Sequence, residues 1–301
     1  MNVINEIEKL DIGRVEENVS LSKYTTYKVG GTALALVYPK SVKKLVSLIK
    51  LLTGSKIKYK VIGNGSNLLF SDKNFDGVII KLTELTNIEF LSYNKIRVEA
   101  GYSLPKLSLL VAKKGLAGLE FASGIPGTVG GAIFMNAGAY KSDMGYIVQS
   151  VRVLTPDCKI ITFENREMDF HYRSSFLQKH PEYICLDAVI KLKKGDKELL
   201  DEVIKERRAR RIESQPLEYP SAGSVFRNPE GNFAGKLIED LGLKGYRIGG
   251  AMVSEKHANF IINYDNATSA DIKNLIDYVH DKVMDEYNID LKIEQEFVNW
   301  E

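Results

Sequence analysis

A stretch rich in glycine and small hydroxyl side chains runs from Ser123 to Gly131, with four glycines between Gly124 and Gly131. Glycine costs backbone entropy, so such a cluster among apolar residues suggests backbone lying against another backbone or a ligand. Successive N–H groups in such a loop form a concavity that suits an anion, phosphate above all. The alternative interpretation is a long turn within a sheet protein.

A second stretch of similar composition, Gly63 to Leu68, directly follows an apolar segment expected to be a strand. It has neither the spacing of a dinucleotide-binding G-x-G-x-x-G nor the Lys-Ser/Thr pair of a P-loop. Alone it is weak support for a binding site. Together, two such loops in one domain could hold the pyrophosphate of a large dinucleotide from both sides.

Several other segments carry polar groups that could act on a substrate, each with a plain structural alternative. In the segment His171 to Phe176, Arg173 could be an ordinary salt-bridge partner. In Pro220 to Pro229, Ser224 could form a turn or present its hydroxyl, and no G-x-S-x-G supports an esterase. Phosphate or a sugar could be bound by Arg227, Asn228 or Lys236, whereas a lone histidine such as His257 is more often structural.

Two carboxylates near the end of the chain, Glu294 and Glu296, lie two residues apart on an expected strand and should therefore share a face. Paired surface carboxylates are common, so they mean little alone. The arginines near the end of a charged helix are expected to be solvated or to complement the helix C-terminus, with phosphate binding as the alternative. They are Arg207, Arg208, Arg210 and Arg211.

The elements that must position these residues follow from apolar periodicity, caps and breakers. A short helix and linker are expected over residues 1–20. Further helices are expected after Ser41 to about Thr53, from Ser103 and Pro105 to about Lys114, from about 196 to Ser214 with Leu199, Leu200, Val203 and Ile204 buried, at Ala234 to Leu241, and at Thr268 to Tyr287. Strands are expected at Leu34–Tyr38, Tyr59–Ile62, Val78–Leu82, Ile88–Leu91, Ile96–Ala100, Ile147–Leu154, Ile160–Phe163, Tyr183–Leu192, Ala251–Ser254, Asn259–Asn263 and Leu291–Val298.

Composition excludes several classes of protein. The 301 residues are 44% hydrophobic and 27% charged, which is typical of a globular protein with a sizeable core. The net charge of +2 gives no reason to expect nucleic-acid binding, and Cys158 and Cys185 do not form a metal-site pair. No signal peptide or membrane helix is evident, so a cytoplasmic location is expected, with no metal, no nucleic acid and no membrane partner.

Taken together and in order, these motifs resemble the UDP-N-acetylenolpyruvoylglucosamine reductase family, in its shorter subtype. The resemblance covers nearly the whole chain. Its motifs are Tyr24–Gly31, Gly63–Leu68, Leu119–Ala139, Tyr172–Ser175, Pro220–Pro229, Ala234–Ile238 and Val253–Asn259. Each is modestly specific, whereas all of them in this order are highly specific.

The resemblance implies an α+β fold with a two-lobed FAD-binding domain of the vanillyl-alcohol-oxidase type at residues 1–195. The lobes would cover about 1–80 and 81–195, and a substrate-binding domain would cover 196–301. The resemblance implies FAD as the cofactor, NADPH as the co-substrate and a UDP-sugar as the substrate. It also implies a monomeric enzyme of peptidoglycan synthesis. Such an enzyme would serve cell wall biogenesis, cell shape and cell division. The residues expected to bind FAD are Gly63, Asn64, Gly65, Ser66, Asn67, Leu68, Ser123, Gly124, Ile125, Pro126, Gly127, Thr128, Gly130, Gly131, Ala137 and Gly138.

The resemblance also assigns catalytic and substrate-binding roles. Arg173 matches the cation that stabilises negative charge on the substrate carboxylate, Ser224 the proton donor, and Glu296 the third catalytic residue. The family tail usually reads Leu-Glu-Pro-Glu-Val-Arg, whereas this chain has Ile293-Glu294-Gln295-Glu296-Phe297-Val298, which leaves Glu294 as an alternative to Glu296. The implied substrate or NADPH contacts are Tyr172, Arg227, Asn228, Lys236 and His257.

Two other functions remain in competition with the reductase. An FAD oxidase of small alcohols or sugars would use the same fold, but the serine motif and the C-terminal glutamate favour the reductase. A binding or regulatory protein that has lost catalysis is favoured only by the altered tail. The choice between NADPH and NADH stays open at this point.

Overall fold

The structure, a computed structural model, describes residues 3–301 and divides into two compact units, each with its own hydrophobic core. Unit 1 comprises the chain up to Glu17, Leu34–Asn64 and Gly77–Ala209. Unit 2 comprises Asn18–Ala33, Gly65–Asp76 and Arg210–Glu301. Two short N-terminal segments thus pack with the C-terminal part of the chain. The functional boundaries at 1–195 and 196–301 remain a prediction.

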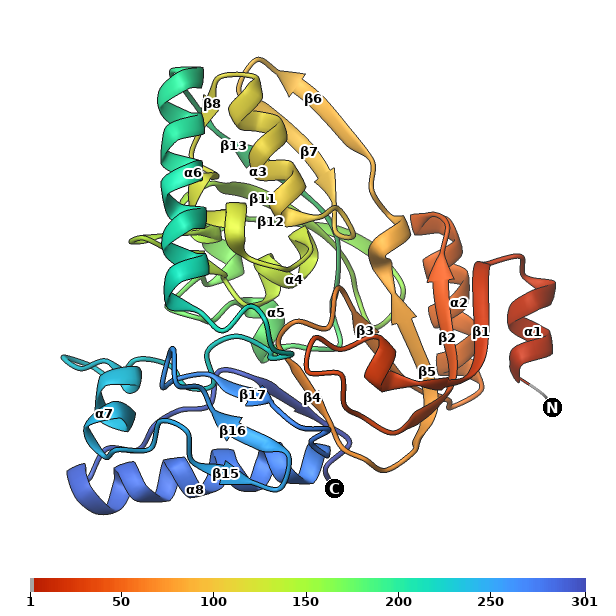
Figure 1. Cartoon of the computed structure of the whole chain (residues 1–301). Coiled ribbons are helices and arrows are strands. Elements are labelled where there is room, and N and C mark those ends of the chain that lie inside the picture. Colours follow the sequence, from red (N-terminus) through yellow and green to blue (C-terminus); the bar gives the residue numbers. More distant parts are fainter. Residues whose placement is uncertain (1–2) are drawn as a thin grey trace. The chain divides into compact units, whose positions relative to one another are not determined.

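One sheet, mostly within unit 1, has the strand order β1-β2-β5-β3 (Figure 1). Its strands are β1 (Gly13–Ser20), β2 (Thr32–Pro39), β5 (Phe75–Lys81) and β3 (Lys58–Ile62), accompanied by the helices α1 (Val3–Lys9) and α2 (Val42–Gly54). The N-cap of α2 is Ser41, whose hydroxyl accepts from the Lys44 N–H at 3.3 Å. Because β3 and β5 pair in parallel with Ile62 opposite Lys81, Gly63 begins its loop beside Lys81.

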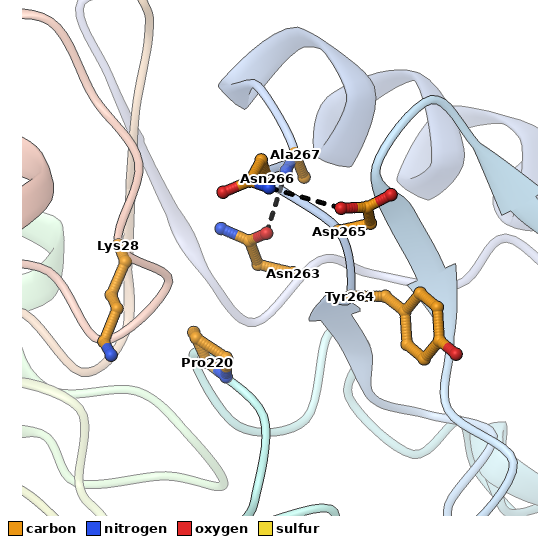
Figure 2. Close-up of a pocket in the computed structure, with 7 residues that line it drawn as sticks. All are labelled: Lys28, Pro220, Asn263, Tyr264, Asp265, Asn266 and Ala267. Atoms are coloured by element: carbon orange, nitrogen blue, oxygen red, sulfur yellow. Dashed lines mark hydrogen bonds between the residues drawn. The ribbon is translucent and has the colours of Figure 1, made fainter.

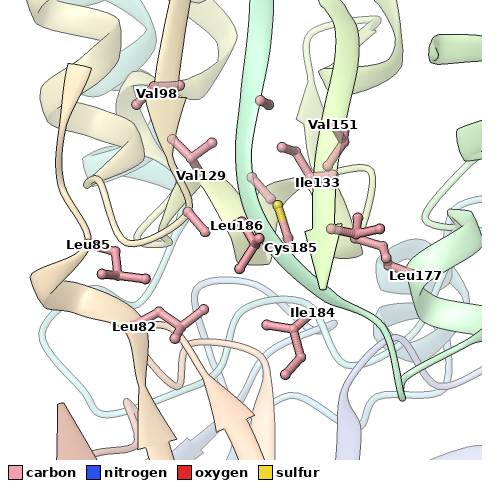
Figure 3. Close-up of a cluster of buried hydrophobic side chains, with 14 of the residues drawn as sticks. Leu82, Leu85, Val98, Val129, Ile133, Val151, Leu177, Ile184, Cys185 and Leu186 are labelled. Atoms are coloured by element: carbon pink, nitrogen blue, oxygen red, sulfur yellow. The ribbon is translucent and has the colours of Figure 1, made fainter. Parts of the chain in front are cut away.

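A five-stranded antiparallel sheet, ordered β12-β11-β13-β7-β6, forms the rest of unit 1. Its strands are β6 (Ile88–Ser92), β7 (Lys95–Glu99), β11 (Val148–Leu154), β12 (Ile160–Glu164) and β13 (Ile184–Lys191). Apolar side chains from these strands meet those of neighbouring helices in one buried cluster, in which Val129 and Ile133 of α4 (Val129–Phe134) lie near Leu186 of β13 (Figure 3). The short pairs are β8 (Leu116–Ala117) with β14 (Lys193–Lys194) and β9 (Gly138–Ala139) with β10 (Ser142–Asp143).

The helices of unit 1 cover this sheet and hold the glycine-rich stretch. They are α3 (Leu104–Lys113), α4, α5 (Phe176–Lys179) and most of α6 (Lys197–Ser214). Helix α6 packs on α3 through Leu200, Ile204 and Ala112. Single 3₁₀ turns link the elements of both units at η1 (Leu21–Lys23), η2 (Leu82–Glu84), η3 (Glu120–Gly124), η4 (Met144–Tyr146) and η5 (Asn165–Met168).

Unit 2 is built on the helix α8 (Ser269–Tyr287), whose apolar face packs on the sheet β15-β16-β17. Its other elements are β4 (Leu68–Phe70), α7 (Ala234–Asp240), β15 (Arg247–Ile248), β16 (Ala251–Val253), β17 (Ile261–Asn263) and β18 (Glu296–Val298). Thr268 and Asp271 form a reciprocal capping box at the start of α8. Strand β18 pairs in parallel with β4, so residues 296–298 lie beside the strand that directly follows the glycine-rich loop at residues 63–68.

The expected helices and most strands are confirmed to within a few residues, but four expectations need correction. Leu199 is 62% exposed and does not belong to the buried stripe of α6. Strands β1 and β4 were not expected, and residues 1–20 contain β1 rather than a linker, while Met1 and Asn2 lie outside the described residues. The stretch Leu119–Ala139 contains η3 and α4. The last strand covers only Glu296–Val298, because the chain bends at Gln295.

Within residues 3–301, no helix has the length and apolar character needed to cross a membrane.

Candidate active site

In unit 1 the start of the loop Gly63–Leu68 touches the stretch Ser123–Gly131. A Cβ atom at position 63 would lie 2.4 Å from Thr128 Oγ1, so only glycine fits there. Asn64 Nδ2 also donates to the carbonyl oxygen of Pro126 at 3.4 Å. The two stretches therefore meet at Gly63, Asn64, Pro126 and Thr128, a contact that the composition, which indicated only another backbone or a ligand beside each stretch, did not specify.

Backbone N–H groups in these loops are available to a ligand. In unit 1, those of Gly63, Asn64 and Thr128 find no acceptor among the described residues. In unit 2, the same is true of Gly65 and Ser66 in residues 3–301. The hydroxyls of this region serve the protein itself, since Ser123 Oγ donates to Glu120 O at 3.0 Å and Thr128 Oγ1 caps α4 through the Gly131 N–H. The open donors suit a phosphate or pyrophosphate.

A positive charge that sequence reasoning missed lies at the same place in unit 1. Lys81, the last residue of β5, donates from Nζ to the carbonyl oxygen of Gly63 at 2.9 Å. Burial lowers the pKa of Lys81, with a smaller contribution from Arg14. The parallel register of β3 and β5 brings it there, and a lysine at the end of an apolar strand was the only sequence signal. An ammonium group here adds to the anion-attracting character of the loop.

Arg173 is held at the corner of a tight turn in unit 1. His171 and Ser174 exchange two backbone hydrogen bonds of 3.0 Å, and Arg173 has a φ of 52°, in the left-handed region. Its guanidinium donates from Nη2 to Gly138 O at 2.7 Å and lies 5.1 Å from the centre of the Tyr172 ring. The structure thus connects three predicted residues, Arg173, Tyr172 and Gly138.

In unit 2, Ser224 lies on a segment fixed by its backbone. Asn259 accepts from Phe226 N through Oδ1 at 3.0 Å, and its Nδ2 donates to Phe226 O at 2.8 Å. The carbonyl oxygen of Asn259 also accepts from the Val225 N–H at 2.9 Å. Asn259 is buried, so these bonds are shielded from water. The sequence motif Val253–Asn259 included this residue without indicating its role.

The C-terminal tail runs along the same segment and then leaves it. Glu294 N donates to Val225 O at 2.7 Å, and Phe226 forms an isolated antiparallel bridge with Ile293. After the bend at Gln295, Glu296 N donates to Asn67 O at 2.9 Å, and β18 begins. The expectation of one continuous strand through Glu294 and Glu296 is therefore wrong, and the period-two reason for a shared face no longer applies. In unit 2, Val225, next to Ser224, accepts from Glu294, and Asn67 is bonded to the backbones of both Glu294 and Glu296.

Comparison with known proteins identifies the family. Residues 215–298 match the model described as UDP-N-acetylenolpyruvoylglucosamine reductase, C-terminal domain, and residues 33–164 match an FAD binding domain. A protein from Bacillus cereus named UDP-N-acetylenolpyruvoylglucosamine reductase 1 is 45% identical over 297 residues, or 98% of both chains. A reductase of the same name from Caldanaerobacter subterraneus is 47% identical over 291 residues, covering 97% of this chain and 96% of the relative. The chain belongs to the UDP-N-acetylenolpyruvoylglucosamine reductase family.

Solved structures agree with this family and with the expected fold class. The crystal structure of the reductase from Thermus caldophilus matches with a TM-score of 0.81 and 36% identity, covering 95% of this chain and 99% of that one. A variant of Phl p 4, described as a glucose oxidase, matches with a TM-score of 0.52 and 14% identity over 65% of this chain and 45% of that one, which shows the fold alone. The chain is therefore an α+β flavoenzyme with an FAD-binding domain.

The remaining residues predicted from the family lie in unit 2 and are mostly engaged in local contacts. Asn228 Oδ1 accepts from Ala234 N at 3.1 Å, and Lys236 pairs with Asp240, which raises the pKa of the lysine. His257 is half-buried, and burial lowers its pKa. The backbone N–H of Arg227, on the segment that carries Ser224, donates to Lys292 O at 2.8 Å.

A polar pocket of about 420 Å³ opens elsewhere in unit 2 (Figure 2). It is lined by Lys28, Pro220, Asn263, Tyr264, Asp265, Asn266 and Ala267. None of the residues predicted for the family site lines it. In the described part of the chain, no group of three or more His, Cys, Asp or Glu side chains is arranged to bind a metal ion.

Proposed function

We propose that this flavoenzyme uses NADPH to reduce the enolpyruvyl ether of UDP-N-acetylglucosamine enolpyruvate, giving UDP-N-acetylmuramate for peptidoglycan precursor synthesis. The family, the matching FAD-binding domain and the reductase C-terminal domain support this reaction. The observation that carries the assignment of residues is the pairing of the Ser224 segment with the tail that contains Glu296. FAD, when bound, would supply the hydride-transfer chemistry between NADPH and the substrate.

The two glycine-rich loops are proposed to bind the FAD pyrophosphate. The backbone N–H groups of Gly63, Asn64 and Thr128 have no protein acceptor among the described residues of unit 1, and the Lys81 ammonium lies beside Gly63. The loop continues in unit 2 with Gly65 and Ser66, whose N–H groups are likewise open in residues 3–301. Such donors balance phosphate charge without a side chain. The other predicted contacts, up to Ala137 and Gly138, belong to the same proposal.

Arg173 is proposed to stabilise the negative charge that grows on the substrate carboxylate as the hydride arrives. A fixed cation is most effective when its position is set before the reaction. The bond from Arg173 Nη2 to Gly138 O and the tight turn between His171 and Ser174 provide such positioning. Tyr172, next to it in the turn, is proposed to contact the substrate.

Ser224 is proposed to protonate the α-carbon after hydride arrives at the β-carbon. A serine hydroxyl is a weak acid in water, so a nearby cation and a dry environment are needed for it to give up a proton to the carbanionic carbon. Glu296 is the proposed third catalytic residue, with Glu294 as the alternative. Arg227, Asn228, Lys236 and His257 are proposed to contact the UDP-sugar or NADPH.

We also propose a cytoplasmic monomer that binds no nucleic acid. Cytoplasm is where a UDP-sugar and NADPH would be met, and the near-neutral net charge of +2 supports the lack of nucleic-acid binding.

Anaerobic half-reactions test the function. Protein reduced with NADPH is mixed with UDP-N-acetylglucosamine enolpyruvate, and flavin reoxidation is followed by absorbance. Reoxidation with formation of UDP-N-acetylmuramate is expected, and failure to reoxidise would refute the proposed reaction.

Ser224→Ala should leave reduction by NADPH intact and slow reoxidation by about 100-fold or more. Ser221→Ala, three residues earlier in the same segment, is the control and should leave both rates unchanged.

A further inference from the structure

Gln295 is a buried amide between the two candidate glutamates. Its exposed fraction is 5%, so its polar atoms need protein partners. The Tyr27 hydroxyl donates to Gln295 Oε1 at 3.0 Å. The Gln295 Nε2 group donates to the carbonyl oxygens of Ala222 at 3.3 Å and Gly223 at 3.4 Å. Proline, which the family pattern places here, could make none of these bonds.

Gln295 lies between two residues whose backbones are tied to other segments. Before it, the Glu294 N–H is bonded to Val225, on the segment that carries Ser224, and the Glu294 carbonyl oxygen accepts from Asn67 Nδ2 at 3.1 Å. After it, Glu296 is bonded to Asn67 and starts the parallel pair of β18 with β4. The side chain of Gln295 therefore fixes the backbone before Ser224, while its main chain directly precedes Glu296.

The other end of this chain of hydrogen bonds is Tyr27, whose side chain is fully buried. Burial raises the pKa of Tyr27, so the phenol stays protonated and remains a donor. The neighbouring Thr26 N–H donates to Gly65 O at 3.2 Å. In unit 2, hydrogen bonds thus connect Tyr27 through Gln295 to Gly223, and the adjacent residue Thr26 bonds the loop at Gly65.

Gly223, whose carbonyl oxygen Gln295 bonds, has a φ of +77°, and a Cβ atom built there would meet nothing within 4 Å. A side chain at this position would therefore find no packing partner, and the hydrogen bond from Gln295 is a restraint placed directly before Ser224. A misplacement of about 1 Å can cost a reaction about 100-fold.

We propose that Gln295 is a positioning residue that holds the Gly223–Ser224 turn and Glu296 in register for proton transfer to the substrate. This proposal rests on the proposed function, because it requires that Ser224 protonate the substrate. Gln295 itself would touch neither substrate nor flavin, and Tyr27 acts through it. The buried amide couples the two catalytic side chains without a charge of its own.

The test uses the complete flavoenzyme with Gln295→Met, which keeps the side-chain length and removes all three hydrogen bonds. Reduction by NADPH should change less than about twofold, while reoxidation by UDP-N-acetylglucosamine enolpyruvate should slow about 10- to 100-fold. The solvent deuterium isotope effect on reoxidation should increase, because proton transfer becomes slower. A purely structural role would slow both half-reactions or neither, and would leave the isotope effect at its wild-type value.

Tyr27→Phe provides a second variant that removes a single hydroxyl, for the case in which Gln295→Met fails to fold. Tyr27→Phe alone should slow reoxidation selectively. If Gln295→Met does fold, adding Tyr27→Phe to it should slow reoxidation no further. Gln149→Met, at a partly buried glutamine of β11, is the matched control and should match the wild type. Wild-type rates in Gln295→Met and Tyr27→Phe would overturn the positioning role. If reduced wild-type protein is itself not reoxidised by substrate, the proposed function fails instead.

Discussion

The hydroxyl oxygen of Thr128 lies 2.4 Å from the point that a Cβ atom at Gly63 would occupy, so these loops can touch only because position 63 has no side chain. Thr128 cannot easily move away, because its hydroxyl also caps α4 through the Gly131 N–H. The approach of the two loops in unit 1 is therefore sensitive to a single methyl group.

Gly63→Ala should weaken FAD binding. Overpacking of this kind costs about 1–3 kcal/mol, and each ~1.4 kcal/mol is tenfold in affinity. We expect a purified variant with substoichiometric flavin and a raised dissociation constant, measured by titrating apoprotein with FAD and following flavin fluorescence. Gly54→Ala is the control, because nothing lies within 4 Å of a Cβ at Gly54. It should bind FAD normally and gain up to about 1 kcal/mol of stability. Equal FAD affinity in both variants would contradict the importance of this contact.

The two glutamates of the tail should differ in kinetics. Glu296→Gln should lower kcat/KM by an amount that corresponds to the loss of several kcal/mol of transition-state stabilisation, whereas Glu294→Gln should change kcat/KM little. The backbones of both glutamates contact Asn67, since Glu296 N donates to Asn67 O at 2.9 Å and Asn67 Nδ2 donates to Glu294 O at 3.1 Å. The expected difference therefore follows from the family pattern, whose second glutamate is matched by Glu296. Steady-state kinetics with both substrates distinguish the variants. A large loss in Glu294→Gln alone would transfer the catalytic role to Glu294.

The ion pair between Arg152 and Asp187 should stabilise unit 1. Asp187 is 1% exposed, and Arg152 Nε donates to its two carboxylate oxygens at 3.0 and 2.8 Å. Fully buried pairs cost about 3–5 kcal/mol when one partner is removed. Because the Arg152 side chain is 43% exposed, water can reach the site, and we expect about 2 kcal/mol for Arg152→Met.

Urea unfolding measures this loss directly. Lys159→Met is the matched control, since Lys159 pairs with Asp157 and both side chains are exposed. Its removal should cost much less than the removal of Arg152, because water already solvates both charges. Equal losses in the two variants would mean that burial of Asp187 contributes nothing.

His280 should make stability depend on pH. Its ring nitrogens lie 3.1 Å from Asp290 and from Asp281, and hydrogen bonds to these carboxylates raise its pKa. Because the folded pKa exceeds the unfolded value of about 6.5, the stabilisation is fully present below that pH and is lost as pH rises through the folded pKa. The pKa of Asp290 is lowered by Lys292 and then by His280, so Asp290 stays ionised in this window.

The comparison of His280→Gln with wild type checks this sign. The difference in unfolding free energy should be larger at pH ~5.5 than at pH ~8.5, because the wild-type imidazolium is lost on the alkaline side. A difference that is constant with pH would show that the contacts of His280 are not electrostatic.

The sequence predicts those features that depend on near neighbours in the chain. The start of α2 after Ser41 and the start of the last long helix near Thr268 have local signals, and the structure contains both helices. Glycine at closely approaching backbone is a composition signal, but it did not indicate that the two loops contact each other. Family resemblance then supplied what local patterns could not, the fold class and the flavin.

Contacts set by register or by distant segments were missed. Lys81 reaches Gly63 only because β3 and β5 are parallel with Ile62 opposite Lys81. Gln295 interrupts the expected last strand, and its partner Tyr27 lies 268 residues earlier in the chain. A period-two pattern cannot reveal a bend whose cause lies that far away. Leu199 is exposed for a similar reason: the face of α6 that packs on α3 contains only Leu200 and Ile204 as buried residues.

The pairing of β4 with β18 has a consequence for synthesis on the ribosome. Ser71, just after β4, bonds Asn299 across a separation of 228 residues, so β4 keeps an open edge while almost the whole chain is being made. Unpaired strand edges favour association with other chains, and long-range pairing folds slowly. Nascent chains halted before Glu296 should therefore be the ones that engage chaperones, and release of the last residues should complete unit 2.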